Sequence, residues 1–485
     1  MSIDVYLDEI AQEAIVEIKN LHKALYGTEL SVVDYVSHNC LSLEIEECDN
    51  LRLGMANYKQ GNLELVLAFN ENKTLKQNVA RLFVLAIFKI SPEIKDILPW
   101  GILTGIRPLK LYRKLTEAYK SQELAKKDLN EFYLLSDEKI RLLEEIYNMQ
   151  APILANYKNE KYISLYIGIP YCPTRCSYCT FPSFTVKHNE EVKRFTKALL
   201  RELRWILELI EEYSVKVAAI YIGGGTPSTL SASEIHEILN LLSKYINFEE
   251  VEVTFEAGRP DTITDKKLHV LNSYGVQRIS INPQTFNNET LKRIGRHHTT
   301  ADVIKAYELS KGMFKYVNMD FIIGLPGESI EDFQKTLAYA NQLQPESITI
   351  HTLSIKTKAK IKDEITAANL KLLPVKDMID YSKTWAQEND YKPYYIYRQK
   401  NIAGNFENIG YSKLGSHSIY NILIMEEAMS IIGVGCGAVS KLKEIDTGVI
   451  KRVANPVNPD YYVKNIDKII QNKQNQIVNV LTKLC

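Results

Sequence analysis

The sequence predicts an α/β fold, which is either a doubly wound parallel sheet or an incomplete barrel of (β/α)6 type. Six short apolar segments between residues 163 and 352 are each followed by residues with helical spacing. The length of 485 residues allows two to four domains, and no fixed-period repeat is visible. Both folds carry their chemistry at the carboxyl ends of the strands, so functional residues are expected there.

The first 160 residues are predicted to form an α+β domain of unknown role. Helical spacing covers residues 4–27 and 74–92. Three segments between these helices alternate like short strands, at 41–45, 51–55 and 63–67. A turn rich in Gly and Pro follows at 101–108, and two helices are expected from there to about residue 157.

Residues 161–360 are predicted to form the parallel sheet and its helices. The expected strands are 163–169, 217–222, 251–255, 278–282, 317–323 and 347–352. Between the first two, apolar residues from Val192 to Ile210 recur every three or four positions and define one buried helix face. The remaining residues, 361–485, have helical spacing near 374–389 and 419–432 and are expected to form a C-terminal α/β extension that covers the substrate.

Charge and cysteine content exclude several classes of protein. Lys and Arg number 59, as do Asp and Glu, and this zero net charge disfavours nucleic-acid binding. The first residues carry acids, and no stretch approaches the ~18 apolar residues of a membrane span, so a soluble cytoplasmic protein is expected. Seven cysteines are too few and of the wrong parity for a disulfide framework.

Three of the cysteines form a cluster directly after a predicted strand. The segment is Tyr-Cys-Pro-Thr-Arg-Cys-Ser-Tyr-Cys, in which Cys172, Cys176 and Cys179 have the spacing Cys-x3-Cys-x2-Cys. A structural zinc ion would need a fourth ligand, and His188 is poorly spaced to supply it. An iron–sulfur cluster held by three thiolates leaves one iron open for another ligand. A zinc site or three incidental cysteines remain the alternatives on spacing alone.

At this motif the sequence resembles the radical S-adenosylmethionine (SAM) superfamily, whose hallmark is this cysteine spacing with an aromatic residue, here Tyr178, before the third cysteine. Within it, the chain is similar to the oxygen-independent coproporphyrinogen III oxidases, also called coproporphyrinogen dehydrogenases, and most to their Gram-positive-type long branch. The matching segments are residues 165–172, 221–227, 256–261, 282–286, 294–296 and 318–326, and for the long branch 100–108 and 395–404.

The resemblance implies two cofactors. A [4Fe–4S] cluster would be held by Cys172, Cys176 and Cys179, with SAM chelated through its amino and carboxylate groups at the open iron. Tyr166 occupies the position that contacts the cofactor region in the family. The implied SAM-binding residues are Tyr178, Gly224, Gly225, Thr226, Glu256, Gln284, Arg296 and Asp320. Glycines suit this role because their backbone can approach a ligand closely.

The reaction implied by the resemblance is the oxidative decarboxylation of coproporphyrinogen III to protoporphyrinogen IX, a step of heme biosynthesis. It proceeds without oxygen, through a 5′-deoxyadenosyl radical, and takes an electron from a donor such as a flavodoxin or ferredoxin. The substrate carries four propionates, so the site needs cations. The candidates are Arg259, Lys356, Arg398 and Lys400.

Two departures keep other functions open. The best-known branch of the family has a fourth cysteine where this chain has Phe181, and a histidine where it has Gly168. Phe181 also occurs in the related heme chaperones, which makes heme transfer the main alternative. An anaerobic heme-degrading methyltransferase is the third reading. His297 and His298 are not expected to bind a metal, because adjacent residues on a helix point apart.

Overall fold

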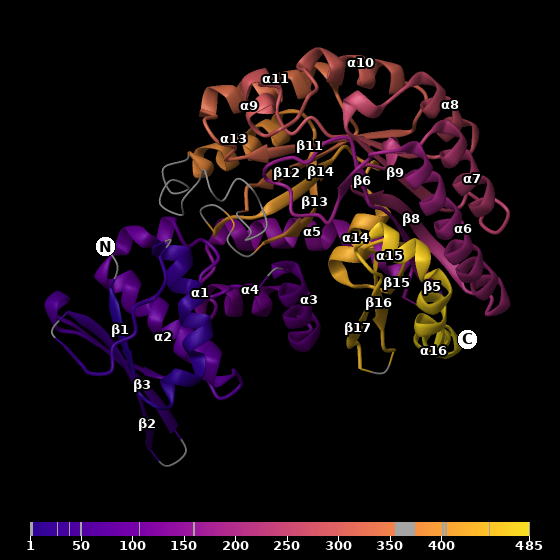
Figure 1. Cartoon of the computed structure of the whole chain (residues 1–485). Helices are drawn as coiled ribbons and strands as arrows, with labels where there is room; N and C mark the ends of the chain where they lie inside the picture. Colours follow the sequence, from indigo (N-terminus) through magenta and orange to yellow (C-terminus); the bar gives the residue numbers. More distant parts are fainter. Residues whose placement is uncertain are drawn as a thin grey trace. The chain divides into compact units, whose positions relative to one another are not determined.

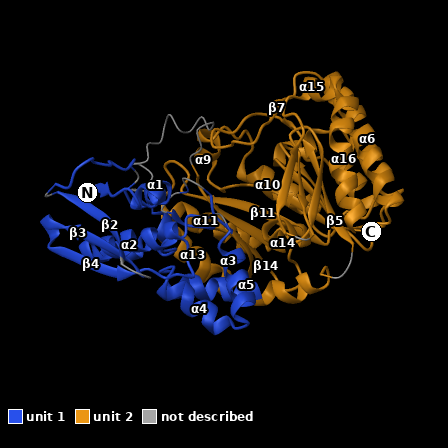
Figure 2. Cartoon of the chain, turned by 90° about the horizontal axis from the view of Figure 1, so that it is seen from below, with its two compact units in different colours: residues 1–147, 363–376, 397–407 blue, residues 148–362, 377–396, 408–485 orange. Residues whose placement is uncertain are grey.

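The computed structural model describes residues 3–26, 28–37, 39–48, 51–105, 107–158, 161–354, 374–399, 402, 405–445 and 447–484. The chain divides into two compact units (Figure 2). Unit 1 comprises residues 1–147, 363–376 and 397–407, and unit 2 comprises residues 148–362, 377–396 and 408–485. These ranges differ from the three expected from the sequence, because most of the C-terminal region lies in the same unit as the parallel strands.

Unit 1 contains a four-stranded sheet of β1 (Asp4–Leu7), β2 (Cys40–Cys48), β3 (Leu51–Tyr58) and β4 (Leu63–Ala68), in that order. Its helices include α1 (Ile15–Tyr26) and α2 (Leu75–Ile90). The predicted helix over 4–27 is wrong at its start. Val5 and Leu7 alternate with polar residues, are buried, and pair in parallel with Leu41 and Leu43, so this segment is a strand.

Three helices, not the predicted two, follow the Gly/Pro turn. They are α3 (Pro108–Tyr119), α4 (Gln122–Glu131) and α5 (Asp137–Ala155). The break between the first two has a local cause. Lys120 ends α3 in the left-handed conformation with φ 50°, and the Ser121 side chain accepts a hydrogen bond from Leu124 N to begin α4.

Unit 2 is built around six parallel strands, which confirms the predicted repeat of strand and helix. In spatial order they are β5 (Tyr162–Ile169), β8 (Lys216–Gly224), β9 (Glu252–Gly258), β10 (Arg278–Ile281), β11 (Tyr316–Ile323) and β12 (Ser347–Thr352). The connecting helices are α6 (Asn189–Glu212), α7 (Ala232–Leu242), α8 (Asp265–Ser273), α9 (Asn288–Arg293), α10 (Thr300–Ser310) and α11 (Ile330–Leu343). These helices follow one another along the outer side of the sheet (Figure 1).

Both edges of this sheet are extended by C-terminal strands. Beyond β12 lie β14 (Asn408–Ser412) and β13 (Lys392–Tyr397), and beyond β5 lie β15 (Ser430–Gly435), β16 (Val439–Lys443) and β17 (Ile450–Ala454). The predicted helix at 374–389 is confirmed as α13 (Val375–Glu388). The one at 419–432 stops early, at α14 (Ile419–Glu426). The β-branched residues that follow are buried in β15, where they pair in parallel with β5.

A buried polar network joins α6 to the strands and helices added at the β5 edge. Glu202 on α6 accepts hydrogen bonds from Gly435 N at 2.8 Å and from the Tyr462 hydroxyl at 2.6 Å. Its other oxygen accepts one from Lys473 Nζ at 2.6 Å. Tyr462 lies in α15 (Pro459–Lys464) and Lys473 in α16 (Ile466–Leu484).

Within the described ranges, no helix is long and apolar enough to cross a bilayer.

Replacing Lys473 with methionine is expected to lower the free energy of unfolding by about 3–5 kcal/mol, because it leaves the buried carboxylate of Glu202 without its cationic partner. The matched control is Arg201→Met on the same pair of helices. Arg201 and Asp467 form an exposed ion pair, which contributes about 1 kcal/mol or less. Urea denaturation of both variants measures the difference, and equal small losses would contradict a stabilising role for the network.

Candidate active site

The cysteine loop leaves β5 and returns toward α6. The short strands β6 (Tyr171–Cys172) and β7 (Phe184–Thr185) pair in parallel and close the loop. Ser177 N donates to Ile294 O at 3.0 Å, which ties the loop to the end of α9. Cys172, Cys176 and Cys179 are all free thiols. The structure therefore holds the three predicted cluster ligands in one loop at the carboxyl end of β5.

Side chains that directly follow β8 and β9 contact the sulfur atoms. Thr226 Oγ1 lies 3.5 Å from Cys172 Sγ, and Arg259 Nη1 lies 3.7 Å from Cys176 Sγ. Burial raises the pKa of the Cys172 thiol and raises that of Cys179 to about 11. Ligation by a metal removes these protons, so cluster binding would be coupled to proton release.

Arg259, expected from the sequence to bind substrate, is committed to the cysteine loop. Its guanidinium is buried and grips Asp261 with two parallel bonds of 3.0 Å. The remaining nitrogen donates to Thr174 Oγ1 at 3.0 Å, within the loop. This geometry makes Arg259 a positive charge beside the thiolates, and a role in gripping a propionate stays a prediction.

The glycines at the end of β8 form a cradle against the cysteine loop. Gly224 has φ +116°, a conformation that residues with a side chain rarely adopt, and a Cβ there would lie 2.8 Å from Ile169 O. A Cβ on Gly225 would lie 2.5 Å from Tyr171 O and 3.0 Å from Cys172 Sγ. Only glycine lets this backbone lie so close to the first cysteine.

Glu256 on β9 faces the same cradle. A Cβ on Gly223 would lie only 2.7 Å from Glu256 Oε2. Burial, together with the charge of Asp320, raises the pKa of Glu256 to about 8, although bonds from Gly224 N–H and the Tyr221 hydroxyl oppose this shift. The free carboxyl is therefore protonated near neutral pH, and once it loses this proton it can accept hydrogen bonds from a cationic or donor-rich group of a ligand.

Asp320 on β11 is a second carboxylate at the strand ends, held by neighbours that the sequence did not single out as partners. Asn318 Nδ2 donates to its Oδ1 at 2.8 Å, and His351 Nε2 lies 3.8 Å from its Oδ2. Burial favours the protonated form, but His351 and Asn318 outweigh it and hold the pKa of Asp320 below its usual value. Gln284, with φ 72°, donates its backbone N–H to Asp320 O at 2.9 Å and so lies beside it.

Arg296 brings a buried cation to the cysteine loop. Its Nη1 donates to Asn282 O, and its side chain bonds Tyr178 and Cys176. Among the described residues, no group accepts from Arg296 Nε, and Asn282 Oδ1 also lacks a partner. A buried N–H of a cation is costly to leave unpaired, so this position fits a bound anionic group such as a carboxylate.

Aromatic rings line the sheet interior below these carboxylates. Tyr166 and Tyr221 stack with ring centroids 6.2 Å apart, and Tyr221 stacks on Tyr420 at 4.8 Å. The Tyr395 hydroxyl lies 3.1 Å from Thr349 Oγ1 on β12. Tyr166 thus lies on the neighbouring strand to the glycine cradle, in register with Tyr221.

The structure does not place the other three predicted cations beside the cysteine loop, the glycine cradle and the two carboxylates. Arg398 belongs to unit 1, where it is buried, stacks over Trp100 at 5.3 Å and donates to Leu103 O at 2.5 Å. Arg398 therefore packs against Trp100 and Leu103, which lie about 300 positions earlier in the sequence. Lys356 and Lys400 lie outside the described residues. Substrate binding by all three stays a prediction.

Comparisons with known proteins place this site in a family. Residues 166–340 match the family model described as the radical SAM superfamily. The chain is 46% identical over 399 residues to the oxygen-independent coproporphyrinogen-III oxidase-like protein HemZ of Bacillus subtilis (strain 168), covering 79% of this chain and 78% of HemZ. The chain belongs to this oxidase-like family of radical SAM proteins. The cofactors of the superfamily are a [4Fe–4S] cluster and SAM.

The chain is also similar to a heme chaperone and to a solved oxidase structure. The heme chaperone HemW of Buchnera aphidicola subsp. Schizaphis graminum (strain Sg) is 31% identical over 328 residues, which are 66% of this radical SAM chain and 79% of HemW. The solved structure of coproporphyrinogen III oxidase (HemN) from Escherichia coli matches with a TM-score of 0.50 at 20% identity, over 66% of this chain and 72% of HemN. The structural match confirms the predicted fold class.

The residues present fit both cofactors of this radical SAM family. Within the part of the chain that the structure describes, no group of three His, Cys, Asp or Glu side chains could hold a single metal ion. A cubane does not require such convergence, because each thiolate binds a different iron. Cys172, Cys176 and Cys179 would hold the cluster, and the glycine cradle, Glu256 and the open Arg296 Nε would receive SAM.

The raised pKa of Glu256 predicts that SAM affinity rises with pH between about 6 and 8. Below about 8 the free carboxyl is protonated, and accepting a bond from the SAM amino group requires loss of that proton. Each pH unit below 8 therefore costs up to about tenfold in affinity. Equilibrium dialysis with SAM across this range, for the reconstituted protein and for Glu256→Gln, measures the effect. A wild-type to variant affinity ratio that stays constant with pH would refute it.

Proposed function

We propose that this protein catalyses the oxygen-independent oxidative decarboxylation of coproporphyrinogen III to protoporphyrinogen IX. The observation that carries the proposal is the 46% identity with a coproporphyrinogen-III oxidase-like protein over 79% of the chain. The site geometry supports it, because the cysteine loop, the glycine cradle and two carboxylates meet at the strand ends of unit 2.

Each part of the site has a role in this proposal. The cysteine loop holds the cluster, Arg296 pairs with the SAM carboxylate, and Glu256 accepts from the SAM amino group. Asp320, kept ionised by His351 and Asn318, accepts from the ribose hydroxyls. When bound, the cluster and SAM would supply the radical chemistry that removes hydrogen from a propionate β-carbon. The buried strand ends exclude water around it.

The proposed substrate carries carboxylates that cationic side chains can bind. Arg398, Lys356 and Lys400 are proposed to bind propionates that are not reacting. For Arg398 the supporting observation is that its Nε has no acceptor among the described residues, although the side chain is buried. After hydrogen is removed, each reacting propionate would lose CO2 and pass one electron to an external one-electron acceptor, which leaves a vinyl group.

Heme transfer is the second candidate. It is favoured by the HemW similarity and by Phe181, which stands where the best-known oxidase branch has a fourth cysteine. A heme chaperone would bind heme stably and would not decarboxylate coproporphyrinogen III. The two functions therefore predict different products from the same preparation.

Anaerobic incubation of the reconstituted protein with coproporphyrinogen III, SAM and a reductant separates the candidates. The oxidase is expected to yield a product that has lost two carboxyl groups, together with methionine and 5′-deoxyadenosine. Cys172→Ala protein, treated in the same way, should yield none of them. Stable heme binding with SAM cleavage but without any decarboxylation would contradict the oxidase and support the chaperone.

A further inference from the structure

The surface next to the cysteine loop is basic, although the whole chain has no net charge. Seven exposed cationic side chains occur between residues 175 and 204. They are Arg175, Lys187, Lys193, Arg194, Lys197, Arg201 and Arg204. The acids in the same range are Glu190 and Glu191 at the start of α6 and Glu202, which is buried and paired with Lys473. The excess of positive charge is therefore local and exposed.

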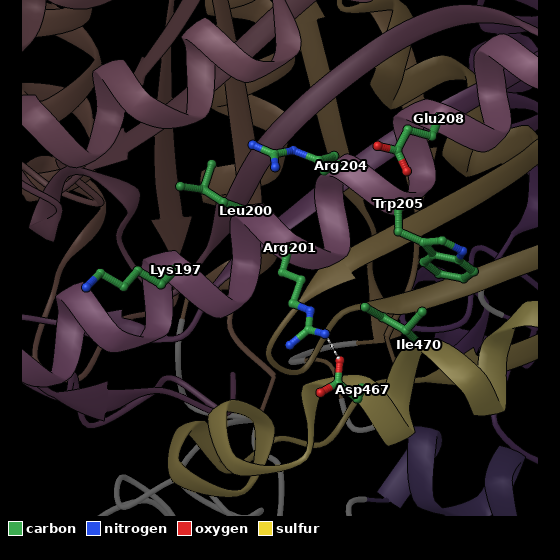
Figure 3. A pocket seen from close by; sticks show the side chains of 8 residues that line it. All are labelled: Lys197, Leu200, Arg201, Arg204, Trp205, Glu208, Asp467 and Ile470. Atoms are coloured by element: carbon green, nitrogen blue, oxygen red, sulfur yellow. Dashed lines mark ion pairs between the residues drawn. The ribbon is translucent and has the colours of Figure 1, made fainter.

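Four of these cations, which we call the basic stripe, share one face of α6. Lys193, Lys197, Arg201 and Arg204 follow one another at intervals of four, four and three residues. Lys197, Arg201 and Arg204 line an open groove of about 420 Å³ whose other wall is α16 (Figure 3). Arg201 pairs across the groove with the exposed Asp467 at 2.5 Å, and Lys193 lies 4.0 Å from Glu190 on the same helix. Glu208 also lines the groove.

The basic stripe begins beside the cluster ligands. Thr185 of β7 lies opposite Cys172 in the parallel pair, and α6 starts four residues later at Asn189. The ring of Tyr171, next to Cys172, packs against Phe195 in the first turns of α6 at 5.4 Å. The stripe thus runs away from the cysteine loop down the outer face of the helix.

Two aromatic side chains on the loop face solvent at this end of the stripe. Phe181, two residues after Cys179, is 62% exposed, and Phe184, which pairs with Tyr171, is 36% exposed. Large apolar side chains exposed together with a charged rim are typical of a surface that another protein covers.

We propose that the basic stripe, with Phe181 and Phe184, is the docking surface for a small acidic protein that delivers single electrons to the cluster. The inference rests on the proposed function, in which the cluster accepts one electron while the carrier is oxidised by one. Electron tunnelling falls off steeply with distance, so the redox centre of the carrier is expected to lie over the loop at Phe181 and Phe184, while the basic stripe holds the rest of the carrier. Opposite charges accelerate such encounters and orient the partner.

The test compares two triple variants with equal changes in net charge. The stripe variant is Lys197→Glu, Arg201→Glu, Arg204→Glu. The control variant is Lys266→Glu, Lys305→Glu, Lys335→Glu, which reverses exposed lysines on α8, α10 and α11. Reduced flavodoxin is mixed with each reconstituted protein, and bleaching of the cluster absorbance gives the rate constant of reduction at low and high salt.

The stripe variant is expected to be reduced by flavodoxin at least about tenfold more slowly at low salt, and the difference should shrink at high salt. The control variant should stay within about twofold of the native protein. Dithionite, a small reductant, should bleach all three clusters equally. Equal flavodoxin rates for the stripe and control variants would overturn the proposal, as would stripe-dependent binding of single-stranded RNA with unchanged flavodoxin rates.

This readout does not require the decarboxylation reaction to occur. Cluster bleaching needs neither SAM nor coproporphyrinogen III, so a protein that fails to decarboxylate still reports on docking. Conversely, a dithionite-reduced protein that cleaves SAM but leaves coproporphyrinogen III intact would count against the oxidase alone.

Discussion

Replacing Cys172 with alanine is expected to abolish the iron–sulfur absorbance of the reconstituted protein and to reduce SAM cleavage by at least a thousandfold. Only three cysteines lie in the loop, so the loss of one leaves two ligands for the cluster. Iron and sulfide analysis after anaerobic reconstitution, together with quantification of 5′-deoxyadenosine, measures both effects.

Cys436→Ala is the matched control for this prediction. Cys436 is also a free cysteine of unit 2, but it is buried beyond the end of β15, and its thiol donates to Pro456 O at 3.2 Å. Its replacement should leave the iron content unchanged. Full iron content in Cys172→Ala, or equal losses in the two variants, would refute the assignment of the cluster ligands.

Replacing Gly224 with alanine is expected to weaken SAM binding by at least tenfold and to lower the free energy of unfolding by about 3 kcal/mol. The added Cβ would strain the backbone at φ +116° and would approach Ile169 O to 2.8 Å. Relief of that contact moves β8 away from β5. It also moves the Gly224 N–H that bonds Glu256.

Gly275→Ala separates backbone strain from the loss of the cradle. Gly275 also has a positive φ, +76°, but a Cβ there meets no atom within 4 Å. Its replacement should cost about 1 kcal/mol in stability and leave SAM affinity unchanged. Dialysis with SAM and urea denaturation measure both variants. A Gly224→Ala protein with native SAM affinity would show that the cradle does not touch the ligand.

The sequence was informative about the fold where an element has a clear period. The six parallel strands are short buried runs, such as residues 163–169, and their helices carry one apolar face. The prediction was wrong where pairing with a distant strand decides whether a segment is a helix or a strand. Residues 430–435 continue an apolar helix in sequence but are a strand because β5 offers an open edge to pair with. Residues 4–7 behave in the same way toward β2.

For the site, the sequence indicated candidate residues where a motif specifies them, but it did not indicate the neighbours that contact those residues. The three cysteines follow one predicted strand, and Glu256 lies at the end of another, so both positions could be recognised in the sequence. The contacts of His351 and Asn318 with Asp320 depend on register between neighbouring strands, which no local pattern encodes. The contacts of Arg259 with Asp261 and Cys176 are likewise tertiary, and its predicted role in substrate binding stays a prediction.

Deuterium transfer tests the central claim most directly. Coproporphyrinogen III labelled with deuterium at the propionate β-carbons is incubated anaerobically with the reconstituted protein, SAM and a reductant, and the 5′-deoxyadenosine is analysed by mass spectrometry. Abstraction from the β-carbon predicts one deuterium in each molecule of 5′-deoxyadenosine and one such molecule for each vinyl group formed. Unlabelled 5′-deoxyadenosine, with the propionates intact, would contradict the proposed reaction.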